Sequence, residues 1–587
     1  MKHSILAIIA SVLLSSVPGG AQQRKISPAL AGAAPNETVQ VIVHYRNPPT
    51  LGRHLKTISG GGFIKADLGM INSGAYAVPG SNLSKIAADP EVMFVSQDHP
   101  VHSLLDLTAA AVNAPAAWWL YGLDGSGIGV AVIDSGISHV EDLRTGGFVR
   151  DSRIVYRENF IDAHSSADFF GHGEHVSGII AGDGQDSKCE QCFRTFRGIA
   201  PGAKLIDLRV LDSEGTGSDS SVIAAIQRAI QLKDTYNIRV INISLGHPVI
   251  ESYQTDPICQ AVELAWQAGI VVVVAAGNDG RDNTFENNGY GTIYAPGNDP
   301  YVITVGAMKT MGTPQRSDDR IASYSSKGPT VVDHIVKPDI VAPGNLVVSL
   351  LAPHGTLEQN YPANLVPLSY FQWNASNAPS ANYFTLSGTS MATPVVSGAA
   401  ALLLEAHPEL TPDQIKARLM LTAYKTFPES SVAYDPTTGQ SFTSYYDAFT
   451  VGAGYLDIQA ALLDNHVFAG AANSPAVSYT PASDNQPATI ALICGSNTIC
   501  SGSASAAISG SATALDEAIS GTQSIWSSQS IWSSQSIWSS QSIWSSQSIW
   551  SSQSIWSSQS IWSSQSIWST SVVEPPQAML VRILGEH

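Results

Sequence analysis

Between residues 129 and 307, short apolar runs alternate with longer amphipathic segments. The runs have the length of buried strands, and the segments between them have the hydrophobic period of helices. We expect strands at 129–137 (ending in an acid and a turn), 204–210, 240–245, 270–275 and 302–307, and helices at 220–232 and 257–268. This alternation predicts an α/β fold in which a parallel sheet carries helices on both faces.

Two polar residues, Asp134 and Asn278, fall just beyond the ends of predicted strands. Ligands of such parallel sheets bind at the carboxyl ends of the strands. Each residue taken alone is an ordinary turn residue, but their common position at strand ends supports a shared site.

A glycine turn and an apolar helix surround Ser390. The stretch Gly388–Pro394 (GTSMATP) follows a predicted strand, 383–386, and precedes a predicted helix, 395–404. Ser390 is therefore expected near a helix N-terminus, where backbone N–H groups and the helix dipole favour negative charge. A nucleophile that attacks a carbonyl needs such donors for the oxyanion. Taken alone, Gly-Thr-Ser is more simply a helix cap, and only the rest of the chain reverses that preference.

Four motifs occur in a fixed order along the chain: AVIDSGI (131–137), GHGEHVSG (171–178), AAGN (275–278) and GTSMATP (388–394). Together they resemble the subtilisin family of serine proteases, in which aspartate precedes histidine and histidine precedes serine. The resemblance covers residues 108–464 and implies a catalytic domain with a mostly parallel subtilisin-like sheet. One such motif is a weak signal, whereas four in this order are a strong one.

The resemblance implies a secreted serine endopeptidase that hydrolyses peptide bonds through an acyl-enzyme. It makes Ser390 the nucleophile, His172 the general base and acid, and Asp134 the residue that orients His172. It assigns Asn278 as a donor to the oxyanion. It also implies two substrate-binding segments. The segment that pairs with the substrate backbone is Ser244, Leu245 and Gly246, and the segment that forms the wall of the primary specificity pocket is Ala275, Ala276 and Gly277.

The sequence departs from the family pattern near the site. Glu174 stands where Thr is usual, and an acid there can raise the pKa of His172 or alter the helix start. Val395 stands where His often follows Pro. Residues 183–196 replace a loop that binds calcium in some relatives. Residues 351–382 are expected to be an insertion that shapes the substrate cleft. Asp142 resembles one calcium ligand of the family, although a lone surface Asp is the simpler interpretation. The chemistry needs no cofactor, and structural calcium is left open without assigned ligands.

The N-terminal part has the features of an exported precursor. Residues 1–21 combine a short positive start, a brief apolar core and small residues for cleavage, as in a signal peptide. Residues 38–101 are predicted to form a small α/β unit, with strands at 38–45 and 92–96 and a helix at 84–88. This unit resembles the family's pro-region, a chaperone and intramolecular inhibitor, and we expect self-cleavage between about residues 99 and 110. An ordinary N-terminal domain is the alternative.

Charge and cysteine usage fit an extracellular protein, with attachment to a cell surface left open. The net charge of −18 argues against nucleic acid as a partner. Outside the signal-like segment, no apolar stretch approaches the length of a membrane span. The expected partners are therefore protein or peptide substrates. Export permits disulfides: Cys189–Cys192 and Cys494–Cys500 can close local loops, and Cys259 is expected to be a buried thiol.

From about residue 465 the composition changes. We expect an Ala/Ser-rich linker at 465–522, a QSIWSS hexapeptide repeat at 523–570 and a C-terminal tail at 571–587 with one strand at 579–584. The repeat suits either stacked extended hexads, as in a β-solenoid, or a disordered tract. Its tryptophans suggest surface or polysaccharide binding as a hypothesis.

Three other functions compete with this interpretation. The chain can be a non-catalytic relative that binds a surface through its Trp repeat. It can use a metal at His172, Glu174 and His175, although H-x-E-H is not the H-E-x-x-H of zinc proteases. It can also be an acid-acting relative in which Glu replaces His as the base, which the presence of His172 and Asn278 disfavours.

Overall fold

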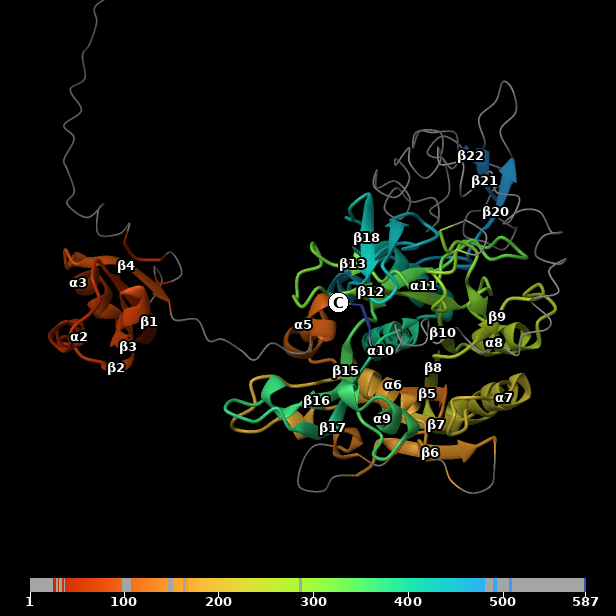
Figure 1. Ribbon diagram of the computed structural model, residues 1–587, viewed down its shortest axis with the longest axis horizontal. Coiled ribbons are helices and arrows are strands. Elements are labelled where there is room, and N and C mark those ends of the chain that lie inside the picture. The colour runs from red at the N-terminus through yellow and green to blue at the C-terminus, as the bar shows by residue number, and fades with distance from the viewer. Residues whose placement is uncertain are drawn as a thin grey trace, which may run out of the picture. The chain divides into compact units, whose positions relative to one another are not determined.

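A computed structural model gives the structure of the chain (Figure 1). It describes residues 25–27, 30, 34–35, 37–97, 107–138, 140–145, 151–161, 165, 167–283, 288–480, 489–493, 506–508 and 585–586. The chain divides into two compact units, Met1–His102 and Ser103–His587. Several predictions lie outside the described residues: the signal peptide at 1–21, the Cys494–Cys500 pair, the hexapeptide repeat and the strand at 579–584.

The described residues of the first unit form a four-stranded antiparallel sheet and two α-helices. Its strand order is β2-β3-β1-β4, and β1 pairs antiparallel with both of its neighbours. The elements are β1 (Thr38–Tyr45), α2 (Leu51–Thr57), β2 (Phe63–Leu68), β3 (Ser73–Pro79), α3 (Leu83–Ala88) and β4 (Val92–Gln97). Alternate residues of β1, including Val41 and Val43, are buried in its core. The predicted strands and helix of this unit are therefore confirmed, and its role as a pro-region stays a prediction.

The second unit is built on an eight-stranded sheet with the order β13-β12-β10-β8-β5-β7-β6, in which β14 also pairs with β12. All of these pairs are parallel except β12 with β13. The strands are β5 (Gly129–Asp134), β6 (Ile154–Asn159), β7 (Lys204–Arg209), β8 (Ile238–Ile243), β10 (Val271–Ala275), β12 (Ile303–Lys309), β13 (Arg320–Ile321) and β14 (Ile340–Pro343). The predicted mostly parallel α/β sheet is thus present.

Two pairs of helices cover this sheet. The first pair is α6 (His172–Ala181) with α10 (Thr389–Ala406), and the second is α7 (Asp219–Tyr236) with α8 (Pro257–Gln267). Both pairs contact the strands, and β5 and β10 are buried at every residue. A strand buried along its whole length requires cover on both faces of the sheet, so the two pairs lie on opposite faces, as the sequence predicts.

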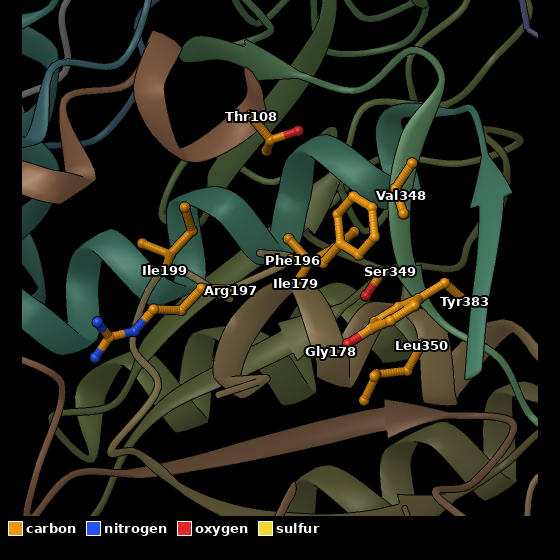
Figure 2. Close-up of a pocket in the computed structure, with 10 residues that line it drawn as sticks. All are labelled: Thr108, Gly178, Ile179, Phe196, Arg197, Ile199, Val348, Ser349, Leu350 and Tyr383. Atoms are coloured by element: carbon orange, nitrogen blue, oxygen red, sulfur yellow. The ribbon is translucent and has the colours of Figure 1, made fainter. Parts of the chain in front are cut away.

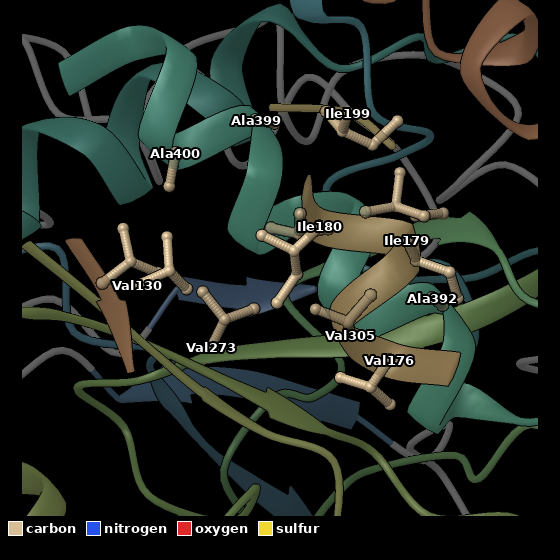
Figure 3. Packing of buried hydrophobic residues seen from close by; sticks show 14 of the residues in the cluster. Val130, Val176, Ile179, Ile180, Ile199, Val273, Val305, Ala392, Ala399 and Ala400 are labelled. Carbon is tan, nitrogen blue, oxygen red and sulfur yellow. The ribbon is translucent and has the colours of Figure 1, made fainter. Parts of the chain in front are cut away.

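The core between the sheet and the α6–α10 pair is made of small and β-branched residues (Figure 3). Val130, Val273 and Val305 from three strands lie below Ile180 of α6 and Ala400 of α10. Among the described residues, α10 is the one helix that is long and apolar enough to cross a membrane, and 83% of that stretch is buried inside the unit. Its apolar surface therefore serves to pack the core.

Smaller elements surround the sheet. They are α4 (Leu107–Ala111), α5 (Ala114–Leu120), β9 (His247–Pro248), β11 (Tyr294–Ala295), β15 (Val347–Leu350), α9 (Thr356–Asn360), β16 (Leu365–Pro367), β17 (Pro379–Leu386), α11 (Pro412–Thr422), β18 (Ser430–Asp435), β19 (Gln440–Tyr445) and α12 (Ile458–Leu463). The Thr411 hydroxyl and Gln414 side chain cap α11 reciprocally. Part of the expected linker instead forms an antiparallel sheet of β20 (Ala476–Thr480), β21 (Thr489–Ile493) and β22 (Ala506–Ile508).

The cysteines behave as expected where they are described. Cys189 and Cys192 form a disulfide that closes a local loop. Cys259 lies in α8 as a buried free thiol, and burial raises the pKa of this thiol well above its usual value. Cys259 is therefore a packing residue, as its position in an apolar helix face predicts.

Candidate active site

The predicted catalytic residues lie at the ends of neighbouring elements. Asp134 is the last residue of β5, and Asn278 follows the end of β10 by three residues. His172 is the first residue of α6, and Ser390 is the second residue of α10. Because β5, β8 and β10 are parallel neighbours, their carboxyl ends share one edge of the sheet, which is where α/β proteins place their ligands.

Asp134 and His172 are joined directly. His172 Nδ1 lies 2.8 Å from Asp134 Oδ1, and the side chain of Asp134 is 1% exposed. The Ser135 backbone N–H donates to the same oxygen at 2.8 Å. Burial would lower the pKa of His172, but the negative charge of Asp134 outweighs it and raises that pKa. The pair therefore favours a protonated imidazole more than water does.

Glycine permits the close approach of α6 to the turn after β5. A Cβ on Gly173 would lie 2.3 Å from the carbonyl oxygen of Gly136 and 3.2 Å from the Cβ of Asp134. Gly173 N also donates to the Ser135 hydroxyl at 2.8 Å. Because backbone atoms cannot move aside cheaply, residue 173 must be glycine for His172 to reach Asp134.

Ser390 is fixed against the end of β8 by a reciprocal pair of hydrogen bonds. Its Oγ donates to the carbonyl of Ser244 at 3.0 Å, and the Ser244 Oγ donates to the carbonyl of Ser390 at 2.9 Å. The Asn242 side-chain amide donates to the Ser244 hydroxyl at 3.0 Å. The N-terminus of α10 is therefore held beside the predicted substrate-pairing segment.

The orientation of the Asn278 amide follows from its contact with the nucleophile turn. Asn278 Oδ1 accepts from the Thr389 backbone N–H at 2.8 Å, so the other amide atom, Nδ2, is a donor. Nδ2 lies 3.5 Å from the position a Cβ on Gly388 would take. A donor at this place, beside the Ser390 backbone N–H, is suited to an oxyanion formed on a substrate of Ser390.

The two predicted substrate-binding segments both contact the start of α10. Ser244, Leu245 and Gly246 follow β8, and a Cβ on Gly246 would lie 2.3 Å from the carbonyl of Ala295. Ala275 and Ala276 are buried at the end of β10, and Gly277 N donates to the Thr389 hydroxyl at 3.2 Å. Their positions suit the roles that the family resemblance implies, and substrate contact itself stays a prediction.

Glu174 does not act on His172 as the sequence suggested it can. It is fully buried, accepts from the Ser138 backbone N–H, and burial followed by the charge of Asp168 raises its pKa well above the usual value. The second acid that raises the pKa of His172, after Asp134, is instead Asp168. Glu174 is therefore not among the groups that shift the pKa of His172, and its carboxylate instead bonds to the backbone of the turn that follows β5.

Asp168 is a site residue that the sequence reasoning missed. Its Oδ1 accepts from Gly171 N at 2.7 Å and its Oδ2 from Glu174 N at 2.8 Å. These bonds satisfy backbone donors at the N-terminus of α6, where helices leave N–H groups unpaired. No helix was predicted at this position, and Asp168 lies three residues before the N-cap residue Gly171, so the sequence carried no clear signal for it.

His175 and its neighbours do not form a metal centre. His175 Nε2 lies 3.1 Å from the carbonyl oxygens of both Val347 and Phe384, and burial lowers its pKa to about 3. The neutral ring therefore donates to backbone rather than turning toward His172. In the part of the chain that the structure describes, no group of three or more His, Cys, Asp or Glu residues is arranged to hold a metal.

The interpretation of Asp142 as a lone surface residue is wrong. Asp142 is fully buried; it accepts from the Asp186 backbone N–H at 2.7 Å and from the Tyr383 hydroxyl at 2.8 Å. Burial raises its pKa to about 7. The sequence could not show this, because Tyr383 is 241 residues away along the chain.

Two hollows border the insertion at 351–382. The smaller is lined by residues of α6 and β15, among them Gly178, Ile179 and Leu350 (Figure 2). Its volume of about 10 Å³ is at the lower limit for a single water molecule. The larger, of about 310 Å³, is lined by Leu346, Asn364, Tyr370 and Thr385 among others. The insertion therefore forms a real pocket next to the strand that leads into Ser390, and a role in the substrate cleft stays a prediction.

A histidine–aspartate pair and a serine at a helix N-terminus, all at the carboxyl edge of a parallel sheet, make the kind of site that serine hydrolases use. Residues 125–454 match the Subtilase family. This chain belongs to that family, and it is a subtilisin-like serine endopeptidase.

Named relatives agree with this assignment. Serine protease AprX of Bacillus subtilis (strain 168) is 35% identical over 364 residues, which are 61% of this chain and 75% of that protein. Subtilisin E of the same organism is 32% identical over 407 residues, 68% of this chain and 83% of that protein. Extracellular serine proteinase of Thermus sp. (strain Rt41A) is 33% identical over 378 residues, 62% of this chain and 73% of that protein.

Proposed function

We propose that the chain is the precursor of a secreted, self-processing serine endopeptidase whose catalytic groups are Ser390, His172, Asp134 and Asn278. The observation that carries the proposal is the 2.8 Å contact between His172 Nδ1 and Asp134 Oδ1. This contact leaves Nε2 of a neutral imidazole as the proton acceptor. The presence of both His172 and Asn278 also disfavours an acid-acting relative with a Glu base.

The reaction begins when the Ser390 hydroxyl leaves the Ser244 carbonyl, to which it donates at 3.0 Å, and turns toward His172. Its oxygen attacks the peptide carbonyl carbon while His172 Nε2 takes the proton. The carbonyl oxygen becomes an oxyanion, which accepts from Asn278 Nδ2 and the Ser390 backbone N–H. Asp134 stabilises the imidazolium that forms.

The tetrahedral intermediate then collapses. The C–N bond breaks, His172 gives its proton to the leaving amine, and the substrate acyl group remains as an ester on Ser390. A water molecule attacks this ester while His172 takes its proton. The ester C–O bond then breaks, His172 returns the proton to the Ser390 oxygen, and the carboxylic acid product leaves. No step requires a cofactor, and structural calcium remains a separate proposal without assigned ligands.

The precursor part of the proposal rests on the N-terminal region. The signal-like segment at 1–21 precedes a unit whose described residues form an α+β fold with a four-stranded sheet of its own. A fold of this kind before a protease domain suits an inhibitor and chaperone that is removed by cleavage between about residues 99 and 110. Export is supported further by the relative that is named an extracellular serine proteinase.

A fluorophosphonate probe tests the nucleophile directly, because such reagents form a covalent bond only with an activated serine. We expect the wild-type chain to be labelled, and Ser390→Ala and His172→Ala to lose the label. Ser397→Ala is the matched control, since Ser397 lies on the same helix but donates to Asn242. Labelling that survives in Ser390→Ala, or that is absent from the folded wild type, would refute the assignment.

A further inference from the structure

Beyond the hexapeptide repeat the chain returns to the protease domain. The described residues Gly585 and Glu586 lie against it, and the Glu586 side chain is 4% exposed. Its contacts come from segments that are 241 to 305 residues away in sequence. A glutamate this far from its partners is buried only when a specific set of groups compensates its charge.

Four donors surround the Glu586 carboxylate. Arg281 Nη2 lies 2.7 Å from Oε1 and Lys309 Nζ lies 2.8 Å from Oε2. The Ser323 backbone N–H donates to Oε1 at 2.9 Å, and the Ser323 hydroxyl donates to it as well. Burial would raise the pKa of Glu586, but the positive charges of Lys309 and Arg281 outweigh it and lower that pKa.

The peptide backbone is recognised as well as the side chain. Asn345 Nδ2 donates to the carbonyl of Glu586 at 2.8 Å, and the Glu586 backbone N–H donates to Asn345 Oδ1 at 2.9 Å. Gly585 has φ +77°, and a Cβ there would lie 2.5 Å from both Leu346 Cδ2 and Ser387 Oγ. The site therefore selects glycine before glutamate, in one backbone conformation.

Glu586 supplies a counter-charge to two largely buried cations, Arg281 and Lys309. Arg281 also pairs with Asp435 at 3.3 Å and lies over the Phe442 ring, 4.6 Å from its centre. Arg281 and Lys309 are 15% and 11% exposed. Among the described residues, Glu586 thus gives both of these largely buried cations a carboxylate partner, and a buried cation without one is costly.

We propose that Arg281, Lys309, Ser323 and Asn345 form a binding site for a Gly-Glu peptide segment, and that Gly585–Glu586 of the same chain occupies it. The chain then contacts the protease domain again at Gly585–Glu586, after the QSIWSS repeat in sequence. The site also borders the nucleophile turn, because the Ser387 hydroxyl, three residues before Ser390, accepts from Leu346 N at 2.8 Å.

The first test adds the segment as a separate peptide. Two chains carry Ser390→Ala so that nothing is cleaved, one full-length and one ending at Leu584, and each is titrated by calorimetry with the peptide ILGEH. We expect binding to the shortened chain and none to the full-length chain, with the peptide ILGQH binding at least about tenfold more weakly, because it keeps the backbone contacts but loses the charge pairs. Equal binding of the two peptides, or no binding to a folded shortened chain, would overturn the proposal.

A second test does not depend on the shortened chain. In full-length Ser390→Ala, deuterium exchange is followed in residues 321–325, where the Ser323 amide donates to Glu586. Glu586→Gln is expected to speed exchange of this segment about tenfold. Glu409→Gln, at a side chain that is 69% exposed, is expected to leave it unchanged. Identical exchange in Glu586→Gln and its parent would contradict the proposal.

Discussion

His172 Nδ1 lies 2.8 Å from Asp134 Oδ1, although the two residues belong to different elements and are 38 positions apart. The distance is set by backbone packing, because Gly173 allows the first turn of α6 to rest on the turn that follows β5. The carboxylate then fixes the imidazole tautomer, and with it the atom that can receive a proton from Ser390.

Asp134→Asn is expected to lower kcat about 10⁴-fold, the typical loss when this carboxylate becomes an amide. It also removes the charge that raises the pKa of His172. Since the neutral imidazole is the active base, activity in the wild type rises with pH through this raised pKa. The acid limb of kcat/KM should therefore move to lower pH in the variant. A pH–rate profile measures both effects, and an acid limb that stays in place would contradict the assignment.

Asn278→Ala is expected to reduce kcat about 10²–10³-fold with little change in KM, because the side-chain donor serves the oxyanion more than the bound substrate. Steady-state kinetics on a peptide substrate provide the measurement. Asn298→Ala is a useful control, since Asn298 is also a buried asparagine but contacts Cys259. A rise in KM alone, with kcat intact, would make Asn278 a ground-state binding residue instead.

Five strands of the main sheet, β5, β7, β8, β10 and β12, could be predicted from sequence because each is a short apolar run between recognisable turns. The strands β6, β13 and β14 were not predicted, since β6 is only half-buried and the other two are very short. Predicted and observed limits differ by one to three residues, as for 204–210 against Lys204–Arg209. The position of Ser390 at a helix start was predictable for the same reason, since Gly388 breaks the strand before it. Local pattern therefore placed Asp134, Asn278 and Ser390 at the ends of elements, whereas His172 and the catalytic roles were predicted from the family resemblance.

Groups whose environment depends on distant segments could not be predicted. Asp142 resembled an exposed turn residue, yet Tyr383 covers it from an insertion strand. Glu586 offered no pattern at all, because its cationic partners come from two distant places: Arg281 from a turn and Lys309 from the end of β12. Burial of a charge follows from such long-range contacts, and single-sequence periodicity carries no information about them.

Gly173→Ala is expected to impair catalysis by displacing His172 rather than by unfolding the domain. A Cβ there would lie 2.3 Å from the Gly136 carbonyl and 3.0 Å from the Gly136 nitrogen. We expect kcat to fall at least about tenfold, since small displacements of catalytic groups have large effects, while the thermal transition persists. Kinetics and calorimetry on the same preparation separate the two effects. A kcat equal to that of the wild type would contradict the prediction, because it would show that the backbone adjusts to the added methyl group without displacing His172.

Asp339→Asn is expected to destabilise the domain by about 3–5 kcal/mol, the usual cost of breaking a buried ion pair. The Asp339 carboxylate forms ion pairs with Lys337 Nζ at 2.7 Å and with Lys416 Nζ at 3.3 Å, and all three side chains are fully buried. Removal of the carboxylate leaves two buried ammonium groups without their counter-charge. Urea unfolding measures the change, with the exposed Asp234→Asn as control. A loss below about 1 kcal/mol would contradict the view that this buried carboxylate holds the two lysines in place.

The central claim is that Ser390 is the nucleophile of a protease that processes its own precursor. Intact mass and N-terminal sequencing of wild-type and Ser390→Ala proteins, purified side by side, test it most directly. We predict that the wild type begins between about residues 99 and 110 and that the variant retains residues 38–101. Identical N-termini in the two proteins, whether trimmed or intact, would contradict the account.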